Sequence, residues 1–152
     1  MKIKIEIGRQ TNFILALILV YFVFFGYLAN VYQKNIGMSI LFLHQVMFSP
    51  QSFLAVIILA GIIFLMVYRE PFYEYGIRNS IWIIPFMVVI SWVWYWFIFG
   101  EFDWTVIGWY WLRIESYITI LTLLGINLLT AILASIAKEK YQRYLLKVKS
   151  ID

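Results

Sequence analysis

The side chains that could perform acid–base or metal chemistry are few in this sequence. The single histidine and three carboxylates are candidates for one shared site: His44, Glu101, Asp103 and Glu115. Imidazole and carboxylate ligands suit a hard or borderline divalent cation, but these four follow no metal-ligand spacing. The chain has no cysteine, which excludes thiolate metal sites and cysteine nucleophiles. No Gly-rich phosphate loop or Ser/His/Asp set is present either. We therefore expect no metal, no cofactor, no catalytic residue and no enzymatic activity of this chain on its own.

A second group of charged side chains lies between two apolar runs: Arg69, Glu70, Glu74 and Arg78. Glu74 and Arg78 are four residues apart, in the order that favours a helical ion pair, but Gly76 between them weakens a helix. We expect a solvated loop with an ordinary ion pair. The alternative is a coupling loop that touches a cytoplasmic partner such as an ATPase.

The composition determines the environment in which these groups are held. Hydrophobic residues make up 64% of the 152 residues and charged residues only 13%, whereas soluble domains are near 45–50% apolar and about 25% charged. A soluble globular enzyme, a disordered tail and a fibrous repeat are excluded. The chain is expected to be an all-α, polytopic integral membrane protein that forms a single bundle.

Uncharged runs predict four transmembrane helices, since about 20 apolar residues cross about 30 Å of hydrocarbon. The run between Lys34 and Arg69 is too long for one helix, and Pro50 divides it. Its first part, residues 36–48, is expected to be a short interfacial or re-entrant helix. The first apolar core is too long for a usual signal peptide, so we expect it to be retained. The predicted spans are residues 12–31, 51–68, 80–100 and 115–137.

The basic residues predict the orientation, because lysine and arginine in short loops stay on the cytoplasmic side. Two basic residues, Lys34 and Arg113, are expected outside. The other ten are expected inside: Lys2, Lys4, Arg9, Arg69, Arg78, Lys138, Lys140, Arg143, Lys147 and Lys149. Both termini are therefore expected to be cytoplasmic in a multi-pass protein of the plasma membrane. Nucleic acid is not expected as a partner, because there is no contiguous basic face with interleaved aromatic residues.

The tail, residues 138–152, continues the last predicted span as a basic amphipathic helix. Its apolar positions have helical spacing: Tyr141, Tyr144, Leu145 and Val148. Such a helix can lie on anionic lipid headgroups, and a docking helix for a partner protein is equally consistent.

Six of the seven tryptophans lie in or near the predicted outer loop: Trp92, Trp94, Trp96, Trp104, Trp109 and Trp111. Tryptophan prefers the headgroup level, where its flat ring and its single N–H are both satisfied, so an aromatic belt is expected. A docking platform for another subunit or a sugar-like ligand is the alternative.

The last predicted span carries a stripe of small and polar residues: Asn127, Thr130, Ala131, Ala134 and Ser135. Small residues at this spacing let helix backbones approach closely, and the asparagine amide can bond across helices. The stripe is expected to face protein, either within this chain or in other integral membrane subunits.

The order of basic N-terminus, span, outer loop, span, inner loop and further spans resembles the first four spans of ABC-2-type exporter permeases. The resemblance implies that residues 69–78 couple to an ATPase, although that family usually has six spans. Small accessory subunits of membrane enzymes are equally similar. With no site in the sequence, we expect a non-catalytic accessory subunit of a larger membrane complex. The alternatives are a small exporter permease component and a membrane immunity protein.

Overall fold

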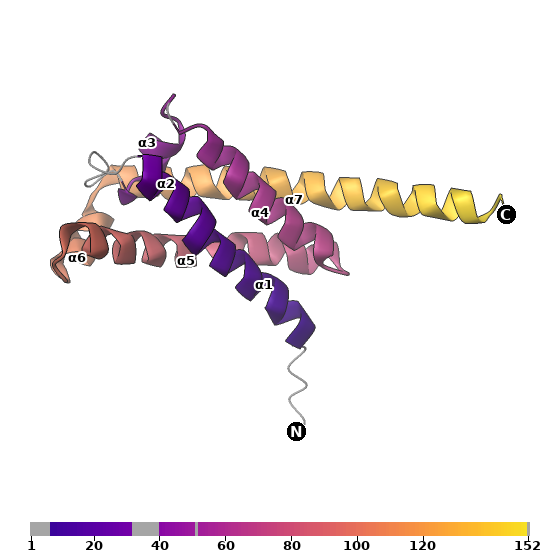
Figure 1. The fold of residues 1–152 in the computed structure, drawn as a ribbon, viewed down its shortest axis with the longest axis horizontal. Coiled ribbons are helices and arrows are strands. Elements are labelled where there is room, and N and C mark those ends of the chain that lie inside the picture. Colours follow the sequence, from indigo (N-terminus) through magenta and orange to yellow (C-terminus); the bar gives the residue numbers. More distant parts are fainter. Residues whose placement is uncertain (1–6, 32–39, 51, 152) are drawn as a thin grey trace, which may run out of the picture.

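The computed structural model describes residues 7–31, 40–50 and 52–151, and within them the chain is helical with no strand (Figure 1). The first long segment is built from three consecutive helices: α1 (Ile7–Leu19), the π-helix η1 (Val20–Phe24) and α2 (Phe25–Val31). The remaining elements are α3 (Leu43–Met47), α4 (Leu54–Arg69), α5 (Tyr73–Phe99), α6 (Thr105–Leu112) and α7 (Ile114–Lys149).

Four helical segments run side by side with alternating direction: α1 to α2, then α4, α5 and α7 (Figure 1). Within the described part of the chain, three stretches are long and apolar enough to cross a membrane, namely Gln10–Ala29, Tyr73–Phe99 and Ile114–Lys149. The expected all-helical class is thereby confirmed. α4 is a shorter apolar helix of 16 residues.

A continuous apolar core lies between these segments. The first segment contributes Ala16, Val20, Phe24 and Leu28, all essentially inaccessible. In a regular α-helix, a four-residue spacing drifts around the helix, because one turn takes 3.6 residues. The wider turn of η1, with hydrogen bonds from i to i+5, offsets that drift. These residues consequently remain on one face, which packs against α4.

The α4–α5 connection is much shorter than the loop expected over residues 69–78. α4 ends at Arg69 and α5 already begins at Tyr73, so Glu74 and Arg78 lie in the first turns of a helix. The expected weakening by Gly76 is overcome by packing: Gly76 is buried against Val67 of α4, with no room for a Cβ. The expectation of a solvated loop at these positions was therefore wrong.

Two further segments differ from the sequence expectations. The outer loop contains a helix, α6, which packs against α7. Of the predicted interfacial helix, residues 36–39 lie outside the described residues, and the described remainder holds only the five-residue α3. Leu41 before this helix and Leu43 and Met47 within it are buried against the bundle.

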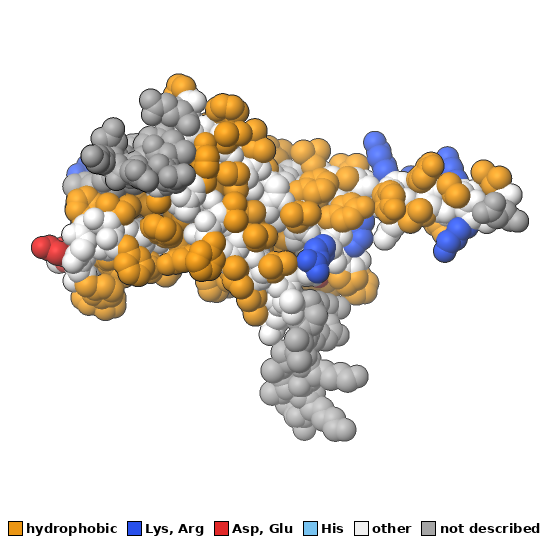
Figure 2. Space-filling view, viewed as in Figure 1, with side chains coloured by type: hydrophobic (Ala, Val, Ile, Leu, Met, Phe, Trp, Pro, Cys, Tyr) orange, Lys and Arg blue, Asp and Glu red, His pale blue; other side chains and the backbone are white. Residues whose placement is uncertain are grey.

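α7 continues well beyond the bundle as an unbroken helix of 36 residues (Figure 1). Its final third projects past the ends of α1, α4 and α5, and carries exposed lysine and arginine side chains interspersed with hydrophobic ones (Figure 2). The expected helical tail is thus a straight continuation of the last long helix.

Candidate functional site at the basic end of the bundle

The end of the bundle where α1 begins, α4 ends and α5 begins is called here the basic end, because Arg69, Arg78 and Lys138 lie there. At its centre is Glu70, which follows α4 and is fully buried. The Nδ2 atom of Asn12 on α1 lies 3.4 Å from Glu70 Oε1, and the second carboxylate oxygen has no hydrogen-bond partner among the described residues. The Lys138 ammonium of α7 donates to the Glu70 carbonyl oxygen. Glu70, at the end of α4, thus contacts both α1 and α7.

The other charged residues of the predicted coupling loop are more exposed. Glu74 is exposed in the first turn of α5, and the Arg78 guanidinium lies over the ring of Tyr75, 4.8 Å from its centroid. The expected Glu74–Arg78 ion pair is not formed. Among the described residues, the ion pair present joins Arg143 and Glu139 on α7, at 2.5 Å. The tip that remains between the helices is Pro71 with Phe72.

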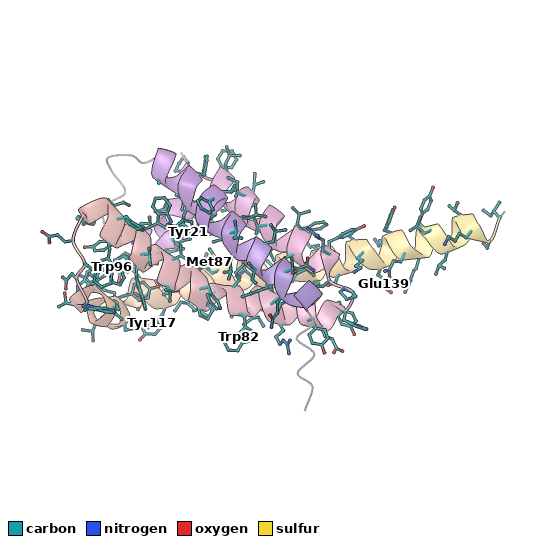
Figure 3. The ribbon with its side chains drawn as sticks, turned by 60° about the horizontal axis from the view of Figure 1, so that its bottom comes forward. Tyr21, Trp82, Met87, Trp96, Tyr117 and Glu139 are labelled. Atoms are coloured by element: carbon teal, nitrogen blue, oxygen red, sulfur yellow. The ribbon has the colours of Figure 1, made fainter. Side chains whose placement is uncertain are left out.

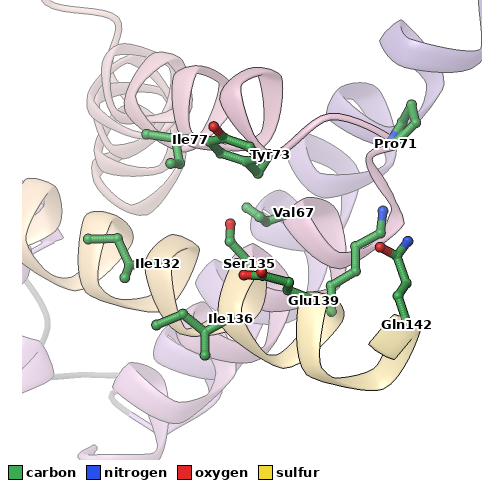
Figure 4. Close-up of a pocket in the computed structure, with 10 residues that line it drawn as sticks. Val67, Pro71, Tyr73, Ile77, Ile132, Ser135, Ile136, Glu139 and Gln142 are labelled. Atoms are coloured by element: carbon green, nitrogen blue, oxygen red, sulfur yellow. The ribbon is translucent and has the colours of Figure 1, made fainter. Parts of the chain in front are cut away.

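A groove of about 610 Å³ opens beside this junction. Figure 4 shows Tyr73 and Ile77 of α5 on one side and Ile132, Ser135 and Ile136 of α7 on the other. Val67 of α4 lies between the two sides, and Pro71, Lys138, Glu139 and Gln142 line the remaining rim.

The small-residue stripe of α7 is used within the chain. Asn127, Ala131 and Ala134 are fully buried and Thr130 nearly so, while Ser135 is half-buried at the groove. The Asn127 side-chain amide donates to the Ser80 carbonyl of α5 at 2.9 Å. Of the two alternatives, the structure uses this face for packing between helices of the same chain.

The projecting part of α7 has an exposed apolar face, called here the tail stripe: Tyr141, Tyr144, Leu145 and Val148. Tyr144 is the most exposed of the four at 63%. At 100° per residue, the lysines lie on both flanks of this stripe, and Arg143 lies on the opposite face of the helix. No described segment of the chain covers it.

The opposite end of the bundle, called here the aromatic end, gathers the six tryptophans named above. Trp96 lies at this end of the bundle (Figure 3). It packs between Phe102 and Trp104, with ring centroids 4.1 and 5.9 Å away, and its indole N–H donates to the Asp103 carbonyl at 2.9 Å. The Thr105 hydroxyl and backbone N–H donate to the Asp103 carboxylate, and these bonds lower its pKa. This network fixes the turn into α6.

The remaining tryptophans pack on neighbouring side chains. Trp92 contacts Tyr110 and Trp111, Trp94 contacts Tyr21, and the Arg113 guanidinium lies 4.6 Å from the Trp109 ring centroid. Burial raises the pKa of the Tyr110 hydroxyl to about 12, and the Ser116 hydroxyl donates to the Tyr110 backbone carbonyl. The rings therefore form a packed cluster, with Trp104 as its most exposed tryptophan at 68%.

His44 is also placed at the aromatic end, on α3. Its Nδ1 lies 2.7 Å from the Thr119 hydroxyl of α7, which donates its own proton to the Glu115 carbonyl at 2.9 Å. Nδ1 is therefore the donor in this contact. Burial lowers the pKa of His44, and the Glu115 carboxylate opposes that shift. Among the described residues, no three metal-ligating side chains come together.

Sequence reasoning missed the two residues that complete the basic end. Asn12 is a polar residue at the start of an apolar run, which is the available signal for an interhelical contact. Gly76 was interpreted only as a helix breaker, although a glycine beside a buried helix contact also permits close approach.

Comparison with known proteins gives no relative: no protein-family model, no curated protein and no solved structure matches this chain. The resemblance to exporter permeases consequently rests on the order of segments alone.

Proposed function

We propose that the protein is a four-span integral membrane protein with both termini in the cytoplasm. The alternating direction of the four helical segments supports an even number of crossings. The basic end would face the cytoplasm, in line with the positive-inside rule. α4 is about 24 Å long, somewhat less than the hydrocarbon thickness. Bilayer thinning, with α3 and its flanking residues packed at the start of α4, would accommodate the difference.

Cysteine labelling tests this topology, since the chain has no native cysteine. Phe48→Cys and Tyr73→Cys place one exposed thiol on each side of α4. An impermeant maleimide should label position 48 in intact cells and position 73 only after permeabilisation. Labelling of both positions from one side would show that α4 does not cross.

Within that membrane placement, we propose that the chain is a non-catalytic subunit of a larger complex and that its tail stripe is the docking element. The observation that carries this proposal is the straight path of α7, which contains no proline and no glycine after Gly125. Residues 138–149 would extend about 18 Å beyond the hydrocarbon. The headgroup layer is only about 5–8 Å thick.

The length of the tail favours a protein partner over lipid for its outer part. Lys138 and Lys140 would lie at the level of the anionic headgroups, as expected for the base of the tail. Tyr144, Leu145 and Val148 would lie beyond the headgroups, where lipid cannot cover them unless the helix bends. An apolar stripe in water is a typical mark of a protein interface.

The charge on the tail indicates what kind of protein would fit. Lysine and arginine outnumber the single glutamate, Glu139, which is paired with Arg143. A second copy of the same helix would bring like charges together, which is unfavourable. The partner we propose is an acidic protein surface with an apolar groove, contributed by another subunit of the complex.

Purification from native membranes in mild detergent tests the assignment. The wild-type protein should migrate in a complex larger than one chain, and raised salt should weaken it because flanking charges contribute. The double variant Tyr144→Ser with Leu145→Ser should migrate alone. Leu146→Ser removes an equally exposed apolar residue away from the stripe and should keep the complex. Wild-type protein that migrates as a lone chain would overturn the proposal.

The exporter permease alternative depends on residues 69–78 as a coupling surface. Glu70 is buried and residues from Tyr73 onward belong to α5, so a narrow tip around Phe72 would have to bear the contact. The permease would be favoured if variants of Glu74 or Arg78 abolish association with an ATPase while the tail-stripe variants still associate with it.

A further inference from the structure

The groove beside the basic end has two chemically different halves. Toward the interior of the bundle it is lined by aliphatic side chains, Ile77, Ile132 and Val67. Toward the projecting part of α7 it is lined by Lys138 and Gln142, with Tyr73 at the rim. The exposure of Ile132 (47%) and Tyr73 (63%) shows that the groove is open to the surroundings.

The polar half carries a net positive charge. Lys138 donates one of its three N–H groups to the Glu70 carbonyl, which holds the ammonium in place. Two N–H groups remain for a ligand. Glu139 also lines the groove, but its carboxylate is paired with the Arg143 guanidinium at 2.5 Å. The cation that remains at the rim is therefore Lys138, supported by the amide of Gln142.

The groove would straddle the inner surface of the bilayer in the membrane placement proposed above, on which this inference rests. The uncharged run of α7 ends at Ala137, directly before Lys138. Ile132 would then lie at the depth of the acyl chains, Ile77 at their boundary with the headgroups beside Arg78, and Lys138 at the depth of lipid phosphates. A basic pocket between helices at this depth has the polarity of a phospholipid site.

We propose that this groove binds one anionic phospholipid. The phosphate accepts hydrogen bonds from Lys138 and Gln142, and one acyl chain lies along Ile77, Ile132 and Ile136. The bound lipid fills the groove between α5 and α7. The lipid therefore contacts both α5 and α7 near the basic end. Deeper in the bundle, the same two helices are joined by the hydrogen bond from Asn127 to Ser80.

Native mass spectrometry of the full-length protein in mild detergent tests the proposal. Phosphatidylglycerol is the probe, and zwitterionic phosphatidylcholine with the same acyl chains is the comparison. The wild type should retain one phosphatidylglycerol and little phosphatidylcholine. Lys138→Gln should weaken retention by about tenfold, as expected for loss of a charge-assisted hydrogen bond. Lys147→Gln makes the same charge change on the tail and should have little effect.

Each remaining outcome is informative. Equal losses in the two lysine variants would show diffuse attraction to the basic tail and would overturn the proposed site. Equal retention of the two lipids by the wild type would do the same. Because Lys138 also contacts Glu70, Ile136→Trp serves as a second variant that fills the groove and leaves the junction intact. It should also reduce retention, and unchanged retention would overturn the site.

The lipid site and the proposed function can fail separately. Lipid retention is measured in detergent without any partner protein, and the tail-stripe variants do not touch the groove. A protein that binds phosphatidylglycerol through Lys138 but migrates alone from native membranes would keep the site and lose the subunit assignment. Inverted cysteine labelling would remove the membrane placement itself.

Discussion

The contact between Gly76 and Val67 gives a quantitative prediction about how α4 and α5 are held together. A Cβ on residue 76 would lie 2.8 Å from Val67 Cγ1 and 3.3 Å from both Val67 Cα and Cβ. Rotation of the valine can relieve the first contact but not the contact with Cα, because that atom belongs to the backbone. Gly76→Ala should therefore force α4 and α5 apart.

The size of the effect follows from two opposing terms. Overpacking a buried contact costs about 1–3 kcal/mol, and this contact lies toward the upper end because a backbone atom takes part. Alanine favours the helix over glycine by about 1 kcal/mol. The free energy of unfolding should therefore fall by about 1–2 kcal/mol, taken from the difference of these terms.

Titration with a denaturing detergent, followed by tryptophan fluorescence, measures this free energy. Gly125→Ala is the matched control, because nothing lies within 4 Å of a Cβ at that position. It should leave stability unchanged or raise it by up to about 1 kcal/mol. A Gly76→Ala protein as stable as this control would refute the close approach of the two helices.

A double-mutant cycle identifies the source of the effect. Val67→Ala removes the methyl group nearest to the new Cβ, so it should destabilise the wild type by loss of buried surface. Combined with Gly76→Ala, it should cost less than the sum, by about 1 kcal/mol. Strict additivity would mean that the alanine does not act through the Val67 side chain.

Three further predictions concern hydrogen bonds that join or cap helices. Asn127→Ala should lower the free energy of unfolding by about 1–2 kcal/mol, through a lost interhelical bond and a small cavity, whereas Leu129→Ala on the exposed face should change detergent titrations much less. Burial lowers the pKa of His44 below 6.5, so the unfolded chain binds more protons than the folded one, and the melting temperature should fall as the pH drops from 8 toward 5.5. His44→Gln should make the melting temperature less dependent on pH, and an unchanged dependence would assign it to another group. Asp103→Ala removes the acceptor of two hydrogen bonds from Thr105 and should shift tryptophan emission to the red as the start of α6 loosens. An emission spectrum identical to that of the wild type would contradict the role of Asp103 at the start of α6.

Much of the helical architecture could be predicted from hydropathy alone. Lipid offers no hydrogen bonds, so an uncharged run of about 20 residues has to satisfy its backbone internally and becomes a helix. Gln10–Ala29 and the apolar parts of α5 and α7 follow this rule. The helical continuation through Lys149 was also predictable, because the i, i+3, i+4, i+7 spacing of the tail contains no helix breaker.

The local placement of α5 and α6 was not predictable in the same way. The start of α5 depends on Gly76 meeting Val67, a contact between two helices rather than a property of either sequence. α6 arises within an expected loop because the Asp103 carboxylate accepts hydrogen bonds from Thr105 at its start and Trp96 packs against the turn. Packing therefore outweighed the weak helix propensity around Gly76.

The sequence by itself determined that this chain consists of apolar helices, that most of its lysines and arginines belong to one end and six of its seven tryptophans to the other, and that its tail is amphipathic. Only the tertiary structure decided that Glu70 is buried between Asn12 and Lys138, that the small residues of α7 face the same chain, and that the tail stripe stands clear of the bundle. The physical reason is the distance along the chain over which each effect acts. Hydropathy and helix propensity act over one or two turns of the chain, whereas burial and groove formation depend on the distances between helices that side-chain packing sets.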